Sequence, residues 1–290
     1  MLTSPNGVGL GLRWEFLDEL VEMLPFSVSG DGSQRGVDFL EISPENYIGR
    51  GGHVTAQLAR LRERLPILTH GLTMSLAGTE PFHAEYMQSL RAFLAEQRSR
   101  WHSDHLCFSS AAGKMLHDLL PPKMNHASVV RTADRVRRAQ DALGVKMAVE
   151  NISFYLPPAS DEMSEAEFVT QICERADCGL MLDVNNLYVN SVNFDFDPQN
   201  WLEHAPLERV VQMHVAGGEW VDDIEGAGRT LIDSHGADVP DPVLALFERA
   251  LARTGPVPVV VERDQAIPPL PKLLEEVERV RAVYARATSH

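Results

Sequence analysis

The sequence predicts an α/β protein that folds as a single (β/α)8 barrel. The main observation is that short β-rich runs alternate with segments whose apolar residues recur at helical spacing. Because strict alternation gives parallel strands joined by right-handed crossovers, eight such units close naturally into a barrel. The predicted strands are 8–12, 37–42, 66–71, 105–108, 146–151, 179–184, 210–215 and 257–262.

The helices between these strands are predicted from apolar residues spaced by three or four positions, which places them on one buried face. Ser164, with Glu167 three residues later, forms a capping box that marks the start of another helix. The clearest apolar sets are Leu17, Leu20, Val21 and Leu24; Val129, Ala133, Val136 and Ala139; and Leu270, Leu273, Leu274, Val277 and Val280.

An open doubly wound sheet is the alternative architecture for the same alternation. Its phosphate-binding signature, G-x-G-x-x-G after the first strand, is absent, because Gly7, Gly9 and Gly11 alternate there instead. Barrels commonly use about 290 residues for one domain. We therefore expect a single domain over 1–290, with no antiparallel block and with long loops at 26–36 and 216–236.

Composition and charge narrow the function classes. The formal net charge of −15 disfavours nucleic acid and anionic membranes as partners and favours divalent cations. The N-terminus lacks a secretory signal and no long apolar run occurs, so we expect a cytoplasmic protein. Cys107, Cys173 and Cys178 are predicted to be buried thiols, and Cys107 would share a face with His105 if that segment is a strand.

Polar residues gather at the predicted carboxyl ends of the strands, where barrels build their active sites. Glu150 and Glu262 each end an apolar run, and a carboxylate buried there is costly without a cation. Arg263 follows Glu262 but should point to the opposite face of its strand. The full set is Glu41, His70, His105, Glu150, Asp183, His214 and Glu262, joined by Asn185, which shares a face with Asp183, and by Asp233 and His235 from the loop 216–236.

Metal binding explains this convergence of histidines and carboxylates, because too few basic residues stand at the other strand ends to neutralise them. Mixed imidazole and carboxylate ligation suits Fe, Mn, Zn or Co and disfavours thiolate-preferring centres. These candidate ligands outnumber the coordination positions of a single metal ion. Two or three ions, bridged by a carboxylate such as Glu150, would use them.

Seven sequence blocks in order resemble the signatures of the multinuclear non-haem iron-dependent oxidases of the methanobactin-biosynthesis type. The similarity runs from about Val8 to Arg263, and the order of the blocks makes it specific. The blocks are LTHGL (68–72), SDHL (103–106), VENIS (149–153), LDVNN (182–186), MHVAG (213–217), IDSHG (232–236) and VER (261–263).

The resemblance implies a barrel that holds two or three ferrous or ferric irons and uses O₂ to modify a ribosomally synthesised precursor peptide (a RiPP), most commonly at a cysteine. It also implies a separate partner protein that recognises the precursor leader. By position, a first iron would take His70, His105 and Glu150, the catalytic set. Glu150 would bridge to a second iron held by Asp183, His214 and Glu262, and a third would take Asp233 and His235 with Asn185.

Two other functions fit the same residues. A metal-dependent sugar isomerase or related hydrolase also places His, Asp and Glu at barrel strand ends, whereas an abasic-site endonuclease would need a basic track that the charge of −15 disfavours. A non-catalytic scaffold that binds a peptide is the third reading. Metal content and dependence on O₂ discriminate among the three.

Overall fold

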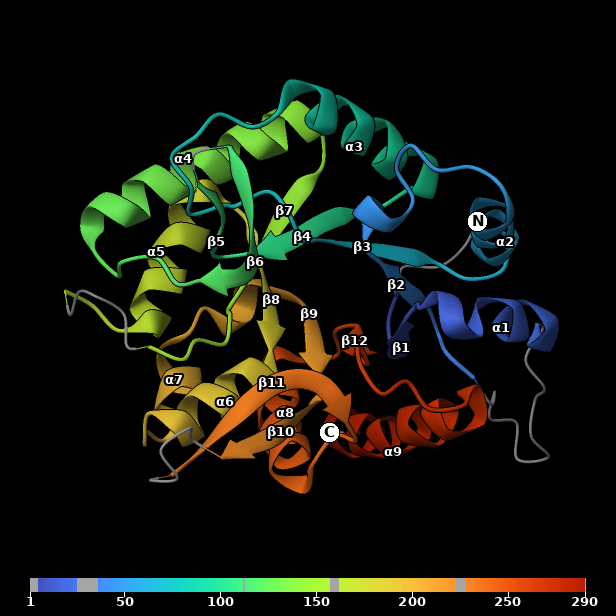
Figure 1. Ribbon diagram of the computed structural model, residues 1–290. Coiled ribbons are helices and arrows are strands. Elements are labelled where there is room, and N and C mark those ends of the chain that lie inside the picture. Colours follow the sequence, from blue (N-terminus) through green and yellow to red (C-terminus); the bar gives the residue numbers. More distant parts are fainter. Residues whose placement is uncertain (1–4, 25–35, 112, 157–161, 223–227, 290) are drawn as a thin grey trace.

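Eight parallel strands form a closed barrel in the computed structural model, which describes residues 5–24, 36–111, 113–156, 162–222 and 228–289. Around the barrel the order of strands is β1-β12-β9-β8-β7-β4-β3-β2, and the predicted fold is confirmed (Figure 1). The strands are β1 (Val8–Gly11), β2 (Leu40–Ile42), β3 (Ile67–Gly71), β4 (Trp101–His105), β7 (Lys146–Glu150), β8 (Gly179–Asp183), β9 (Val210–Val215) and β12 (Val259–Val261).

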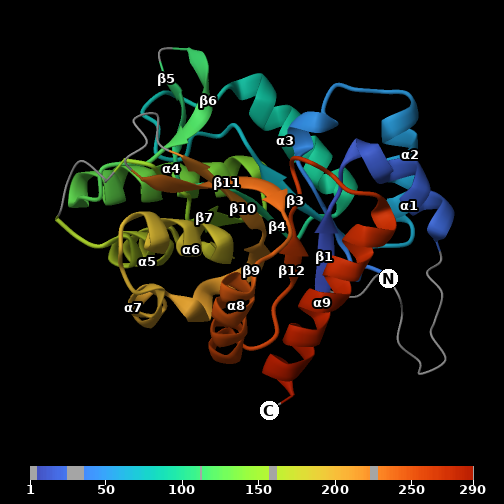
Figure 2. The same ribbon diagram turned by 60° about the horizontal axis from the view of Figure 1, so that its bottom comes forward.

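Helices surround the barrel, as a view turned by 60° makes plain (Figure 2). The predicted capping box of α5 is confirmed, since the Ser164 side chain accepts from the Glu167 amide and Glu167 accepts from the Ser164 amide. The helices are α1 (Leu17–Met23), α2 (His53–Arg62), α3 (Ala84–Gln97), α4 (His126–Leu143), α5 (Glu165–Ala176), α6 (Val184–Asn193), α7 (Pro198–His204), α8 (Asp241–Thr254) and α9 (Leu270–Thr288), with 3-10 turns η1 (Trp14–Phe16), η2 (Pro44–Asn46) and η3 (Leu207–Arg209).

Strand alternation divides the barrel interior into an apolar layer and a polar layer. Phe39, Leu68 and Val260 form a buried apolar cluster of their own. Two residues further along each chain segment, the same inward face presents Glu41, His70 and Glu262. Gly9 makes room for the Phe39 ring, since a Cβ at Gly9 would lie 2.4 Å from the ring. These polar residues therefore sit above a packed apolar floor.

The fourth barrel strand is Trp101–His105, and the predicted strand at 105–108 is wrong. The apolar run at 106–108 drew the prediction, whereas the true strand carries polar residues that are buried and hydrogen-bonded. Asp104, for example, is completely buried and accepts from the amides of His105 and Met74. Cys107 lies beyond the strand, in a turn where its amide donates to the His105 carbonyl, so the two residues do not share a strand face.

Two antiparallel hairpins follow barrel strands, which contradicts the expectation of no antiparallel block. One hairpin pairs β5 (Phe108–Ala111) with β6 (Lys114–Leu120), and the other pairs β10 (Gly217–Asp222) with β11 (Arg229–Ala237). The long loop expected at 216–236 is therefore largely strand. The loop expected at 26–36 lies, apart from its last residue, outside the described residues.

No helix in the described part of the chain is long and apolar enough to cross a membrane. The three cysteines are free and buried, as predicted.

Candidate metal centre

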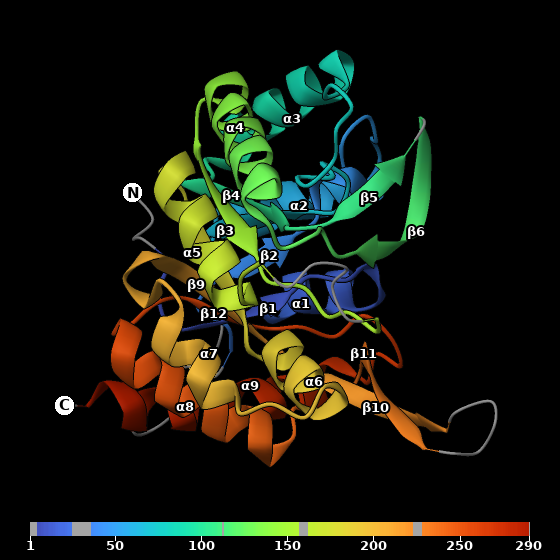
Figure 3. The ribbon, with the colours of Figure 1, turned by 90° about the vertical axis from the view of Figure 1, so that its left-hand side faces the viewer.

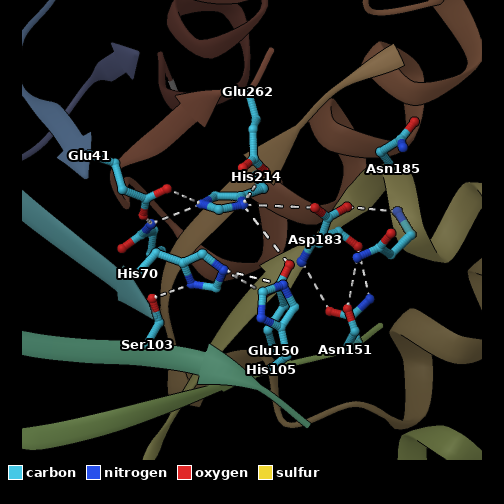
Figure 4. A network of polar contacts seen from close by, with 12 residues as sticks. Glu41, His70, Ser103, His105, Glu150, Asn151, Asp183, Asn185, His214 and Glu262 are labelled. Carbon is cyan, nitrogen blue, oxygen red and sulfur yellow. Dashed lines mark hydrogen bonds and ion pairs between the residues drawn. The ribbon is translucent and has the colours of Figure 1, made fainter. Parts of the chain in front are cut away.

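The predicted site residues converge at the carboxyl ends of the barrel strands (Figure 4). His70, His105 and Glu150 lie at the ends of β3, β4 and β7, and the other ligand candidates continue around the mouth. Asp183 ends β8, His214 lies on β9, Glu262 directly follows β12, and Asp233 and His235 lie on β11. Three groups of these side chains are close enough to hold a metal ion each.

The first group consists of His70, His105 and Glu150. Glu150 Oε2 lies 3.1 Å from His70 Nε2 and 3.2 Å from His105 Nε2, and the two imidazole nitrogens are 3.3 Å apart. Glu150 is 2 % exposed. Two imidazoles and one carboxylate oxygen thus converge on one point, and of the three side chains only that of His105 is partly exposed, at 12%.

The second group shares Glu150 with the first and adds Asp183 and His214. His214 Nδ1 lies 4.0 Å from Glu150 Oε1, 3.8 Å from Asp183 Oδ2 and 3.0 Å from Glu262 Oε2. Because Glu150 turns one oxygen to each group, it has the position of a bridging carboxylate.

The third group consists of Asp183, His235 and Glu262, and it shares Asp183 with the second. His235 Nδ1 lies 3.3 Å from Glu262 Oε2, and its Nε2 lies 2.6 Å from Asp233 Oδ1. Asn185 donates from Nδ2 to the same Asp233 oxygen at 2.6 Å. Asp233 and Asn185 therefore border the third group on the side away from Glu262.

The backbone at His235 has a φ of 48°, in the left-handed region that residues other than glycine rarely adopt. Such a conformation persists only where surrounding structure enforces it, commonly at functional sites. Here the carbonyl oxygen of His235 accepts from the amides of Asp264 and Gln265, which holds the hairpin against the segment after β12.

Buried partners fix the orientation of the ligand candidates. Ser103 Oγ is 2.9 Å from His70 Nδ1, so Nε2 of that ring faces Glu150. Glu41 Oε1 is 2.8 Å from His214 Nε2, so Nδ1 faces the second group. Such outer partners set the tautomer and ring orientation of metal-binding histidines. Asp183 Oδ1 accepts from the Asn186 amide and thereby caps α6. Its other oxygen, Oδ2, is then available to a metal ion.

The pKa values of the site residues reflect the crowding of charges. Burial opposes a charge on His70, but the Glu150 carboxylate outweighs it and raises the pKa of His70 to about 9. Burial, with the charges of Glu150 and Asp233, raises the pKa of Asp183 well above its usual value. Against burial, His235 and His214 hold the pKa of Glu262 well below its usual range. A metal cation beside Asp183 would favour its ionised form against burial and against the neighbouring negative charges.

Unsatisfied buried atoms show that a cation fits this donor set. Glu150 Oε2, Asp183 Oδ2, Asn185 Oδ1 and His214 Nδ1 are buried and accept no hydrogen bond within the described protein. Buried polar atoms nearly always have a partner. Glu150, Asp183 and His214 belong to the three groups, and imidazole with carboxylate oxygen is a donor set that suits iron, manganese or zinc.

Arg13 is a site residue that the sequence analysis missed. Its guanidinium, which follows β1, contacts the Asp264 carboxylate and lies 3.2 Å from Glu262 Oε1. The expectation that too few basic residues neutralise the carboxylates is therefore wrong for Glu262. Arg263 instead contacts the Gly236 carbonyl, Asp238 and Glu276, away from the mouth, as strand alternation predicted.

Glu45, after β2, is a second neighbour of the site. Its Oε1 accepts from the Leu72 amide at 3.1 Å, from Thr73 Oγ1 at 3.1 Å and from the Tyr86 hydroxyl at 2.6 Å. It thereby fixes the segment that follows His70. In the sequence, the only sign of this role is an acidic residue shortly after a predicted strand end.

Fold and site together define a (β/α)8 barrel with a buried, multi-ligand histidine and carboxylate centre. Solved structures share the fold: D-psicose 3-epimerase in the presence of D-fructose superimposes with a TM-score of 0.60 at 12% identity, covering 98% of this chain and 100% of that one. Endonuclease IV from Thermus thermophilus gives 0.57 at 14% identity, covering 98% and 99%. At such identities the likeness concerns the fold alone.

The chain belongs to the family of RiPP precursor modification enzymes MbnB/TglH/ChrH, whose model matches residues 7–285. This confirms the resemblance drawn from the seven blocks. A UPF0276 protein of Acinetobacter baylyi is 40% identical over 287 residues, which cover 99% of this chain and 94% of that protein. A UPF0276 protein of Pseudomonas aeruginosa is 41% identical, with 97% and 94% covered.

Proposed function

We propose that this protein is an iron- and O₂-dependent oxidase that modifies a cysteine of a ribosomally synthesised precursor peptide, presented with the help of a separate leader-binding protein. Membership of the precursor-modifying family supports a peptide substrate. The donor set supports a redox-active metal, because mixed imidazole and carboxylate ligation suits iron and leaves no thiolate of the protein in the site.

One observation carries the proposal: three ligand groups are contiguous and share Glu150 and Asp183. Glu150 and Asp183, as shared carboxylates, would each hold two neighbouring ions. Several adjacent irons would supply the redox equivalents and a site for a substrate thiolate. A single-ion isomerase or hydrolase centre would need only three or four of these side chains.

The residues of the chain divide this work among themselves. His70, His105 and Glu150 would hold the first iron, Glu150, Asp183 and His214 with Glu262 the second, and His235 with Asp183, Glu262, Asp233 and Asn185 would surround the third. The second group is fully buried, whereas the side chains of His105 in the first group and of His235 in the third are each 12% exposed. Substrate would therefore approach the centre at the first or the third group rather than at the second.

Ser103 and Glu41 would keep the imidazoles of His70 and His214 turned toward the centre through the chemistry, because each holds the nitrogen that faces away from it. The apolar floor beneath, built from Phe39, Leu68 and Val260, excludes water from below. A dry site strengthens every electrostatic interaction inside it.

Mass spectrometry of a short cysteine-bearing peptide encoded beside this gene tests the proposal. The peptide is incubated with iron-loaded protein, with and without O₂, together with the neighbouring candidate partner protein. We expect an oxidative mass change only with O₂, and none when the peptide's cysteine is replaced by serine. Equal turnover under strict anaerobiosis would refute the oxidase and favour the isomerase.

A further inference from the structure

Arg135, on helix α4, is a partly buried guanidinium whose contacts are all uncharged. Nη2 donates to the carbonyl oxygens of Met74 at 3.4 Å and Ser75 at 3.3 Å, and Nη1 donates to the Glu80 carbonyl. The guanidinium carbon lies 4.3 Å from the centre of the Phe82 ring. Three carbonyl dipoles and an aromatic face orient this cation without neutralising it.

No carboxylate forms an ion pair with Arg135 within the ranges of the chain that the structure describes. The Glu80 carboxylate is turned instead to the amide of Gly113, 3.3 Å away. Nε of Arg135 is buried and has no hydrogen-bond acceptor among the described residues. Burial and, to a smaller extent, the charges of Arg131 and Arg138 lower the pKa of Arg135, whereas the charge of Glu80, which lines the same cavity, acts in the opposite direction.

Two neighbouring cavities meet at Arg135, and both are also lined by Pro81 and Phe82. The first, of about 340 Å³, extends under the β5–β6 hairpin to Lys114 and Met115. The second, of about 530 Å³, lies between α3 and α4 and reaches Arg138 and Arg91. The hairpin stands at the edge of the barrel, beside these elements (Figure 3).

The first cavity begins close to the candidate metal centre. Thr73 and Tyr86 line it, and Thr73 stands three residues after His70. The hydroxyl groups of Thr73 and Tyr86 both donate to Glu45. These bonds hold this wall of the cavity against the residues that follow β3. An extended chain advances about 3.3 Å per residue, so a few residues lead from this wall to the metal-ligand strand end.

We propose that this cleft, from Thr73 past Arg135 to Arg138, binds an acidic segment of the peptide substrate, and that a carboxylate of the peptide pairs with Arg135. The assignment rests on the proposed peptide-modifying function. The three carbonyl contacts leave Arg135 a second N–H on Nη1 for a carboxylate oxygen, and a partly desolvated cation gains most from an anionic partner.

The size and lining of the cleft favour a peptide over a small free anion. Ligand cavities commonly measure about 300 to 1,000 Å³, and each of the two reaches that range. Phe82, Met87 and Met115 provide apolar surface beside the guanidinium groups. Alternating acidic and apolar side chains would complement such a lining.

Fluorescence anisotropy of a fluorescein-labelled peptide of alternating Glu and Leu tests the assignment with metal-free, full-length protein. A matched peptide with Gln in place of Glu isolates the charge. We expect the Glu peptide to bind at least about tenfold more tightly than the Gln peptide, because a charge-assisted pair contributes that much. Binding should weaken as salt is added.

Three variants locate the binding. Arg135→Met should remove the preference for Glu, and Arg135→Lys should restore part of it. Arg138 pairs with Asp134 at 2.8 Å and its side chain is 73% exposed, so Arg138→Glu breaks only a surface ion pair and should weaken binding without disturbing the fold. Arg137→Met is the matched control on the same helix, since Arg137 contacts Asp134 and the Arg175 carbonyl and lines neither cavity.

Equal binding of the two peptides, no binding to the wild-type protein, or undiminished binding to both Arg135→Met and Arg138→Glu would overturn the assignment. The measurement needs neither iron nor O₂, so its result is independent of oxidase turnover. Oxidation of a precursor without binding of the Glu peptide refutes only the cleft, whereas binding without oxidation refutes only the proposed function.

Discussion

Replacing Glu150 with glutamine should remove more than one iron from each chain and abolish turnover. Glutamine keeps the volume and one acceptor oxygen and removes the charge. Glu150 Oε2 is 3.1 Å from His70 Nε2 and 3.2 Å from His105 Nε2, while Oε1 faces His214 Nδ1 at 4.0 Å. One substitution therefore withdraws an anionic ligand from two groups at once.

The magnitude follows from the coupling of Glu150 to its neighbours. In the metal-free site, this carboxylate outweighs burial and raises the pKa of His70 from 6.5 to about 9, a net effect of about 3 kcal/mol. Loss of an outer partner of a metal ligand already costs about 10- to 100-fold in affinity. Loss of a shared ligand should thus weaken each of the two ions by at least about 100-fold, or about 2.7 kcal/mol.

The assay is iron per chain by elemental analysis after gel filtration, with circular dichroism to monitor the fold. Glu165→Gln serves as the control, because Glu165 is a partly buried carboxylate that accepts from Trp201 Nε1 at 3.0 Å and belongs to none of the three groups. The control should keep its iron. If Glu150→Gln keeps its full iron complement and its activity, the bridging assignment is wrong and Glu150 is a structural carboxylate.

Three further predictions concern the same centre. His235→Ala should remove one ion and leave the other two, because His235 belongs only to the third group, and iron per chain measures this. Glu41→Gln should lower iron affinity about 10- to 100-fold, since the His214 ring loses the carboxylate 2.8 Å from its Nε2, and competition with a chelator measures the change. The last prediction concerns the stability of the protein without metal. The pair of His70 with Glu150 contributes about 3 kcal/mol to the free energy of unfolding below about pH 6.5, and this contribution is lost as the pH rises through about 9. Urea unfolding at both pH values measures the difference.

Each of these has a result that contradicts it. Loss of all iron in His235→Ala would mean that the ions bind only as a unit. Unchanged iron affinity in Glu41→Gln would show that the neighbouring Gln212, whose side chain also contacts Glu41 and His214, suffices to orient the ring. For the pH prediction, Glu150→Gln is the control: its unfolding should lose this pH dependence, and identical profiles in both proteins would refute the pairing.

The barrel and most of its mouth were predictable because both follow from strand periodicity. Parallel strands place successive carboxyl ends on one rim, so a polar residue that ends an apolar run, such as Glu150, is located without knowledge of tertiary contacts. The fourth strand was not predicted because its polar residues Ser103 and Asp104 are buried and satisfied by hydrogen bonds, which hydrophobic periodicity does not detect.

The sequence pattern could not predict residues that reach the site from segments distant along the chain. Arg13 lies 249 positions from Glu262 along the chain, and only closure of the barrel between β1 and β12 brings them together. Asp233 and His235 were found, but as loop residues. The hairpin places them on β11, where the left-handed backbone at His235 turns its imidazole between Asp233 and Glu262.

Metal content of the purified protein tests the central claim most directly. Protein isolated from iron-supplemented cells, desalted and measured by elemental analysis against its amino-acid content, should hold about two to three irons per chain, because the three ligand groups share Glu150 and Asp183. Zinc alone, found in protein from several growth conditions, would contradict a multinuclear iron centre.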